Sequence, residues 1–205
     1  MPVELIFTER RSELGRVRSQ NLDRLTREIE EAAAEAVATS HYEEVDPARL
    51  ARASAIVLSG SSAPWEVREP RELARLRDAV FESRKPVLGI CAGMQLQATF
   101  AGGRLSRAAR REHGFLPIEV VDGGDLLVGI PNEAVVFQDH TDEVVDLPNG
   151  FRVLARSSAC GVQAIAAPAQ GWFGTQFHPE EWTAEHPAGA RVLRNFFALI
   201  RGHGV

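Results

Sequence analysis

Cys91 has the neighbours expected of a nucleophile held at a sharp turn. It is one of only two cysteines, it follows the apolar run PVLGI, and Gly89 and Gly93 lie two residues to either side. This G-x-C-x-G pattern is typical of a nucleophile elbow, where small neighbours let the chain reverse between a strand and a helix. The start of the next helix favours the thiolate, and the N–H of Ala92 is free to receive an oxyanion. The pattern alone leaves open a second interpretation, a structural cysteine between incidental glycines.

His178 and Glu180 supply the groups that such a nucleophile needs. The stretch GTQFHPEEW ends a predicted strand with His178-Pro179-Glu180. Residues two apart in an extended chain point to the same side, so Glu180 can hold one imidazole nitrogen while the other takes a proton from a thiol. By itself this pattern is more often a surface histidine and glutamate beside a turn proline. Combined with Cys91, it predicts a thiol nucleophile, its base and an orienting carboxylate.

The elements that must position these residues follow an alternating pattern. Apolar β-branched runs predict buried strands, and apolar residues at helical spacing predict the helices between them. The expected strands are residues 3–7, 55–59 and 86–90, and the expected helices are 19–38, one opened by Pro70, and 92–101. Later strands are expected at 115–121, 133–138, 151–157, 162–168 and 172–177, before a final helix over 189–201. The pattern predicts an α/β fold, a single domain over 1–205 with a mostly parallel sheet and helices on both faces.

Composition and local patterns limit the partners, the compartment and the cofactors that we expect. The 205 residues carry a net charge of −5, which gives no electrostatic reason to expect a nucleic-acid or membrane partner. Two cysteines cannot form a disulfide framework and the N-terminus lacks a signal-peptide layout, so we expect a cytoplasmic protein. No metal site and no cofactor are predicted, because SGSSAP lacks the ending of a phosphate loop and four histidines show no ligand spacing: His41, His113, His186 and His203.

The two motifs and their surroundings resemble class I glutamine amidotransferases, and within that family the glutaminase part of GMP synthase. The resemblance covers most of the chain, in the family's order and spacing: residues 55–66, 86–95, 102–115, 137–144, 151–168 and 174–180. It implies a flavodoxin-like architecture and a triad in which Cys91 attacks the side-chain amide of glutamine. His178 would shuttle the proton and Glu180 would hold His178, giving a γ-glutamyl thioester and then glutamate and ammonia.

The resemblance also implies an oxyanion hole made by the N–H of Ala92 and a second N–H from the loop after residues 55–59. The family usually reads Ser-Gly-Gly-Pro there, whereas this chain reads Ser-Gly-Ser-Ser at 59–62. The second donor would be Ser61, next to Gly60, where glycine is normally favoured for unusual backbone angles. This departure leads us to expect a hole that a partner organises.

Glutamine recognition is carried over to four residues: Gln95, Asp139, Thr141 and Asp142. The family commonly reads Ser-His-Gly-Asp where this chain reads Asp-His-Thr-Asp at 139–142. An anionic Asp142 suits the α-ammonium of glutamine. The departures at Asp139 and Thr141 leave the identity of the amide substrate open.

The ammonia released from glutamine is useful only if another enzyme consumes it. The resemblance implies a separate glutaminase subunit that supplies an ATP-dependent synthetase, with xanthosine monophosphate as the best-matching acceptor, because few residues follow Glu180. One alternative is a free-standing hydrolase of γ-glutamyl or other amide substrates. Another is a catalytically silent regulatory subunit, which the intact set of Cys91, His178 and Glu180 disfavours.

Overall fold

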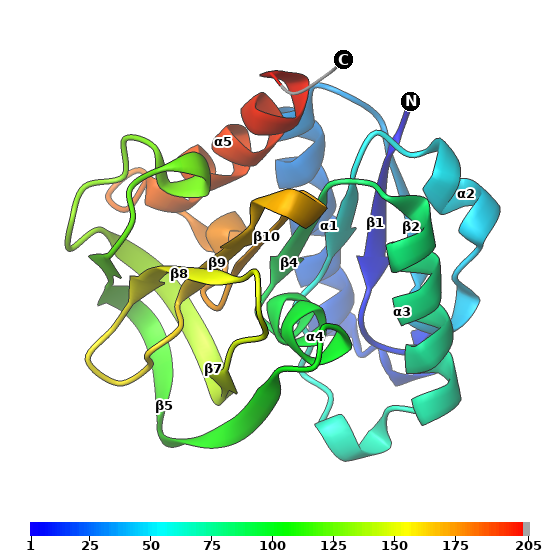
Figure 1. The fold of residues 1–205 in the computed structure, drawn as a ribbon, viewed down its shortest axis with the longest axis horizontal. Helices are drawn as coiled ribbons and strands as arrows, with labels where there is room; N and C mark the ends of the chain where they lie inside the picture. Colours follow the sequence, from blue (N-terminus) through cyan, green and yellow to red (C-terminus); the bar gives the residue numbers. More distant parts are fainter. Residues whose placement is uncertain (203–205) are drawn as a thin grey trace.

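A twisted eight-stranded sheet runs through the centre of the molecule, and a long two-stranded ribbon lies beside it (Figure 1). The computed structural model describes residues 1–202. Five neighbouring strands run parallel, in the order β2 (Val37–His41), β1 (Val3–Phe7), β3 (Ile56–Leu58), β4 (Val87–Ile90) and β10 (Trp172–Thr175). The sheet continues antiparallel through β9 (Ala164–Ala167), β8 (Arg152–Arg156) and β6 (Glu119–Val120).

Helices cover both faces of the parallel part. One face packs on α1 (Arg16–Ala33) and α5 (Ala188–Gly202), and the other on α2 (Pro47–Arg52), α3 (Pro70–Ser83) and α4 (Ala92–Phe100). Alternation along β1 shows why, since Leu5 belongs to the first apolar cluster and Ile6 to the second. The expected α/β architecture with a mostly parallel sheet is confirmed.

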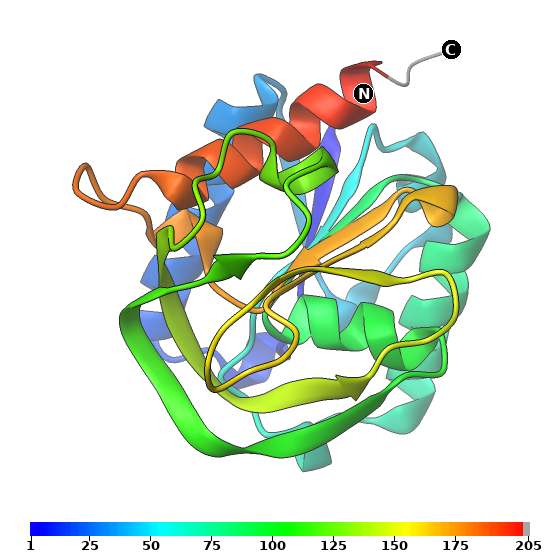
Figure 2. The same cartoon turned by 60° about the vertical axis from the view of Figure 1, so that its left-hand side comes forward.

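The ribbon of β5 (Arg104–Pro117) and β7 (Val135–Asp146) curves around the outside of the antiparallel strands (Figure 2). Its pairing is interrupted between Arg107 and Glu112. The sequence predicts only parts of the ribbon, because the first half of β5 is rich in charged residues and lacks an apolar alternation. Its pairing with β7 makes it a strand.

The expected helix over 19–38 is too long. Helix α1 ends at Ala33, and Ala34 caps it in the left-handed conformation at φ 52°. Residues 37–41 then form β2 at the sheet edge, a strand that the sequence patterns did not predict. None of the helices in the described part of the chain is both long and apolar enough to cross a bilayer.

Candidate active site

Cys91 occupies the sharp turn between β4 and α4. Its backbone lies at φ 49° and ψ −108°, a conformation that residues other than glycine rarely adopt. A Cβ at Gly93 would overlap the Leu58 carbonyl oxygen, and one at Gly89 would lie 2.6 Å from the Gly93 carbonyl carbon. Both glycines are therefore required by close backbone approach, and the turn they permit aims the thiol out of the sheet.

His178 and Glu180 lie just beyond the end of β10, the parallel neighbour of β4. Nδ1 of His178 and Oε1 of Glu180 are 2.9 Å apart, and Glu180 is only 5% exposed. Burial acts to raise the pKa of Glu180, but the adjacent His178 brings it below its usual value. Burial likewise opposes charge on His178, yet Glu180 and Cys91 together raise the pKa of His178 well above its ordinary range. The buried carboxylate thus favours an imidazolium.

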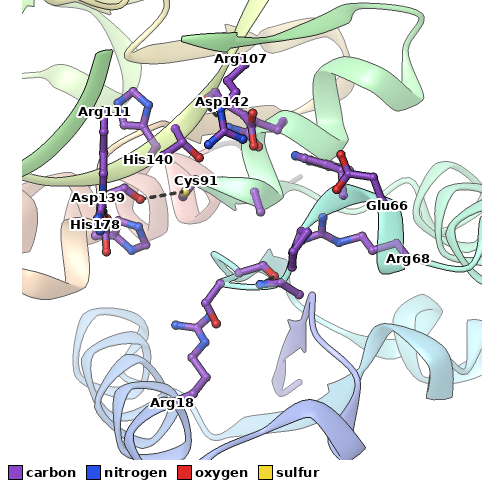
Figure 3. A pocket seen from close by; sticks show the side chains of 18 of the residues that line it. Arg18, Glu66, Arg68, Cys91, Arg107, Arg111, Asp139, His140, Asp142 and His178 are labelled. Carbon is purple, nitrogen blue, oxygen red and sulfur yellow. Dashed lines mark hydrogen bonds and ion pairs between the residues drawn. The ribbon is translucent and has the colours of Figure 1, made fainter. Parts of the chain in front are cut away.

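Gly60, at the start of the loop after β3, lies against both reactive side chains. A Cβ on Gly60 would be 2.8 Å from Cε1 of His178 and 3.5 Å from Cβ of Cys91. These three residues therefore meet at one point, at the carboxyl ends of β3, β4 and β10. Cys91 and His178 line a pocket of about 460 Å³ that opens beside them (Figure 3).

Two glutamine side chains fix the surroundings of the sulfur. Nε2 of Gln176 donates to Sγ of Cys91 at 3.5 Å. Nε2 of Gln95 donates to Oε1 of Gln176 at 3.1 Å and to the carbonyl of Asp142 at 2.8 Å. The Cys91 thiol also lies 3.9 Å from the carbonyl oxygen of Asp139. Gln176 was not among the site residues expected from the sequence, although it precedes His178 by two residues, a spacing that places both on one side of an extended chain.

The polar end of the pocket comes from β5 and β7. Asp139, Thr141 and Asp142 line it, as expected from the sequence. The Asp139 carboxylate is engaged, 2.6 Å from the Arg111 guanidinium and 3.3 Å from Nδ1 of His113. Burial acts to raise the pKa of Asp139, but these two partners bring it below its usual value.

Four arginines line the pocket, and none of them was expected from the sequence. The four that line it are Arg18, Arg68, Arg107 and Arg111. Arg107 is the direct partner of Asp142 in the β5–β7 ladder, so it places a cation close to that carboxylate (Figure 3). Arginine spacing along β5 gave no signal, because only the pairing with β7 shows which of its side chains face the pocket.

The two expected oxyanion donors lie on either side of Cys91. Ala92 is the first residue of α4, so its N–H has no carbonyl partner within the helix. Ser61 lines the pocket, and its N–H has no hydrogen-bond partner in the described part of the chain. Ser61 is not among the described residues with positive φ. A serine fits here without the backbone angles that favour glycine.

Comparison with known proteins places this arrangement in a family. The family model described as glutamine amidotransferase class-I matches residues 17–200. The chain belongs to this family. A glutamine-hydrolysing GMP synthase subunit of Thermococcus kodakarensis is 42% identical over 118 residues, which cover 58% of this chain and 62% of that protein. Glutamine-hydrolysing GMP synthase of Bacillus subtilis is 36% identical over 178 residues, covering 87% of this chain and 34% of that protein.

A solved structure agrees along the whole class I amidotransferase fold. A candidate GMP synthase subunit from Thermoplasma acidophilum superposes with a TM-score of 0.80 at 25% identity, covering 99% of this chain and 96% of that one. The matched stretches span less than two thirds of the length of the Thermococcus and Bacillus relatives.

One buried cluster of this amidotransferase has the residue types of a metal site. Ligand atoms of Glu112, His140 and Cys160 lie within 4.8 Å of one another, although the sequence spacing predicted no metal. Glu112 already accepts hydrogen bonds from Ser157 at 2.9 Å and Gln163 at 2.8 Å, and the Cys160 thiol donates to the carbonyl of Val162 at 3.4 Å. Nε2 of His140 lies 3.2 Å from Oε2 of Glu112, and Nδ1 of His140 is buried without a hydrogen-bond partner among the described residues. The absence of a metal stays a prediction. His203, also considered in that prediction, lies outside the described residues.

Proposed function

We propose that this chain hydrolyses glutamine to glutamate and ammonia through Cys91, His178 and Glu180. One observation carries the proposal. A strained cysteine at a strand–helix turn lines a pocket with a histidine that a buried carboxylate holds at 2.9 Å. Nucleophile, base and orienting group are the parts that acyl transfer requires.

The geometry supports a two-step reaction. The Cys91 thiolate attacks the side-chain carbonyl carbon of glutamine, and the oxyanion forms between the N–H groups of Ala92 and Ser61. The intermediate collapses as the C–N bond breaks, with His178 giving its proton to the departing ammonia. His178 then takes a proton from water as the water attacks the γ-glutamyl thioester, which releases glutamate and regenerates the thiol. Glu180 stabilises the imidazolium in the stages in which His178 carries the extra proton.

The other end of glutamine carries an ammonium and a carboxylate, and the β5–β7 wall of the pocket offers a pair of opposite charges to receive them. Asp142 suits the α-ammonium, and Arg107, its partner across the β5–β7 ladder, suits the α-carboxylate. Gln95 and Thr141 complete this wall. Asp139 contributes its backbone carbonyl beside the sulfur, because Arg111 and His113 occupy its carboxylate.

The ammonia would pass to a separate ATP-dependent synthetase, as in a two-subunit GMP synthase. The Thermococcus and Pyrococcus relatives, which are named as subunits of GMP synthase, support this assembly. The matching stretch of the Bacillus protein covers about a third of that longer chain, which supports a partner that supplies the remaining functions. Xanthosine monophosphate is then the expected acceptor.

Steady-state assays test the proposal. We expect the purified chain to release equal amounts of glutamate and ammonia from glutamine, and Cys91→Ala to release neither. Adding the synthetase subunit of a GMP synthase with ATP and xanthosine monophosphate should convert the ammonia to the 2-amino group of guanosine monophosphate and raise kcat. Full-speed turnover that no synthetase changes would instead support the free-standing hydrolase, and no turnover under either condition would support a silent subunit.

A further inference from the structure

We propose that Glu9 and Arg18 position the oxyanion-donor loop. They act as a clamp that fixes the orientation of the Ser61 N–H. Neither residue belongs to the motifs of the catalytic site, and the clamp rests on the proposed glutaminase reaction. The sequence led us to expect that a partner organises this loop, and this stays a prediction. Contacts from within the chain already hold the loop on both sides of Ser61.

Glu9 holds the far side of the loop. It follows β1, is only 3% exposed, and its Oε1 accepts from the backbone N–H of Ser62, from the Ser62 hydroxyl at 2.8 Å and from the Ser61 hydroxyl at 3.2 Å. Its Oε2 accepts from Nε of Arg18 at 2.5 Å. Hydrogen bonds to a buried carboxylate are strong and directional. Because the three loop groups all donate to this one carboxylate, they have one favoured arrangement.

Arg18 holds the near side. Its Nη2 donates to the carbonyl of Gly60 at 2.6 Å, and that oxygen also accepts from the hydroxyls of Ser59 at 2.8 Å and Thr8 at 3.2 Å. The Gly60 carbonyl and the Ser61 N–H belong to one planar trans peptide and point in opposite directions. Fixing the carbonyl on Arg18 therefore fixes the direction of the N–H.

The clamp explains how Ser-Ser can stand where the family reads Gly-Pro. The Ser62 N–H, which a proline would lack, is bound to Glu9, and both serine hydroxyls reach the same carboxylate. Arg18 holds the Gly60 carbonyl, which precedes the Ser61 N–H in the chain. Glu9 holds the Ser62 N–H, which follows it. The Ser61 N–H between them has no partner among the described residues.

Glu9→Gln tests the clamp with little change of shape. An oxyanion donor acts only after attack, so we expect kcat for glutamine to fall by about ten- to hundredfold while KM changes by less than about twofold. Alkylation of Cys91 by iodoacetamide, a displacement that forms no oxyanion, should keep the parent rate. Ser62→Ala removes one of the three loop donors to Glu9 and should show a smaller loss of kcat. Glu119→Gln, which breaks an exposed ion pair with Arg156, is the matched control.

Amide hydrogen exchange measures how firmly the loop is held, independently of enzymatic activity. Peptides covering residues 59–64 should exchange faster in Glu9→Gln than in the parent and the Glu119→Gln control. Unchanged exchange in these peptides would overturn the clamp. A joint decrease of kcat, of the apparent affinity for glutamine and of the alkylation rate would also overturn it. A parent chain without glutaminase activity, but with faster loop exchange in Glu9→Gln, would refute the proposed function and retain the clamp as a loop-positioning device.

Discussion

At the scale of single residues, the two cysteines show how surroundings decide chemistry. Both are largely buried, at 5% exposure for Cys91 and 1% for Cys160. Cys91 lines the pocket beside His178, whereas Cys160 lies near acidic groups and its burial raises its pKa to about 12. Of the two, Cys91 lines the pocket and so has a route for a substrate.

We therefore expect a glutamine analogue with a diazo-ketone side chain to alkylate Cys91 and spare Cys160. The thiol of Cys160 is protonated at neutral pH, and a thiol is a poor nucleophile. Peptide mass mapping after reaction measures the label on each cysteine. Equal labelling of both would contradict the assignment, and labelling in Cys91→Ala would show that the reagent reaches Cys160 directly.

Glu180→Gln should lower the pKa of His178 and reduce activity, but less than His178→Ala or Cys91→Ala. The carboxylate at 2.9 Å raises the pKa of His178, so its neutral replacement removes that stabilisation of the imidazolium. The orienting member of a triad is also the least costly to remove. Titration of the His178 C2 proton by NMR checks the first result, and steady-state kcat checks the second. A His178 titration that does not move would exclude the ion pair.

At the scale of elements, helix α1 connects the two halves of the site. Arg18 in its first turn binds the oxyanion-donor loop. Further along, Arg24 pairs with Glu181 at 2.7 Å, and Glu28 accepts from Nε1 of Trp182 at 2.6 Å, just beyond the residues that carry the base. Arg24 and Glu28 are four residues apart, so their side chains lie on one side of the helix. A rigid helix thus holds the donor loop and the histidine segment at a fixed separation.

Trp182→Phe should weaken this connection by removing the indole donor and leaving the Glu28 carboxylate without it. We expect a loss of about 1.5–3 kcal/mol in the free energy of unfolding, the usual contribution of a hydrogen bond to a charged group. Urea unfolding measures it. Phe173→Leu, which alters a different aromatic contact, shows what loss of ring packing alone does. A stability equal to that of the parent would mean that the bond contributes nothing.

Gly93→Ala should destabilise the contact between β3 and α4 far more than Gly161→Ala. The added methyl would overlap the Leu58 carbonyl oxygen, whereas nothing lies within 4 Å at Gly161. Backbone atoms must separate to admit it, at a cost of about 1–3 kcal/mol or more. Thermal unfolding of both variants gives the comparison. Equal melting temperatures would mean that α4 can shift freely.

At the scale of the whole molecule, buried charges tie stability to pH. Three buried carboxyl groups have pKa values below their usual range: Glu9, Glu112 and Glu180. Burial opposes their ionisation, but their partners outweigh it: Arg18 for Glu9, and histidines for Glu112 and Glu180. Their contribution to stability is complete above the pKa that they have when unfolded and is lost as pH falls through the lower folded value.

We therefore expect the free energy of unfolding to decrease steadily as pH falls below about 4.5, the ordinary value for glutamate. His178 has the opposite sign, because its raised pKa gives stability that is lost as pH rises through its folded value. Urea titrations between pH 3 and pH 9 measure both effects. A smaller acid loss in Glu9→Gln than in the parent would assign part of the slope to that residue. Stability independent of pH below 4.5 would contradict the depressed pKa values.

Local sequence was sufficient to predict the sharp turn at Cys91 and most of the parallel sheet. Residues 86–95 predict a strand, a sharp reversal and a helix, because glycines beside Cys91 and the apolar periods act over only a few neighbours. His178 and Glu180 are likewise related by a two-residue period that a short stretch carries. These patterns also sufficed to indicate the family.

Tertiary structure decided what depends on contacts between distant segments. Strand β2 and the first half of β5 have weak local patterns and exist because β1 and β7 pair with them. Gln176 reaches Cys91 across 85 residues of chain, and Arg107 faces the pocket only because β5 pairs with Asp142 on β7. The clamp of Glu9 and Arg18 likewise joins three segments, the end of β1, the start of α1 and the loop at 60–62. A hydrogen bond depends on separation in space, which local periodicity does not encode, so only the folded chain shows these partners.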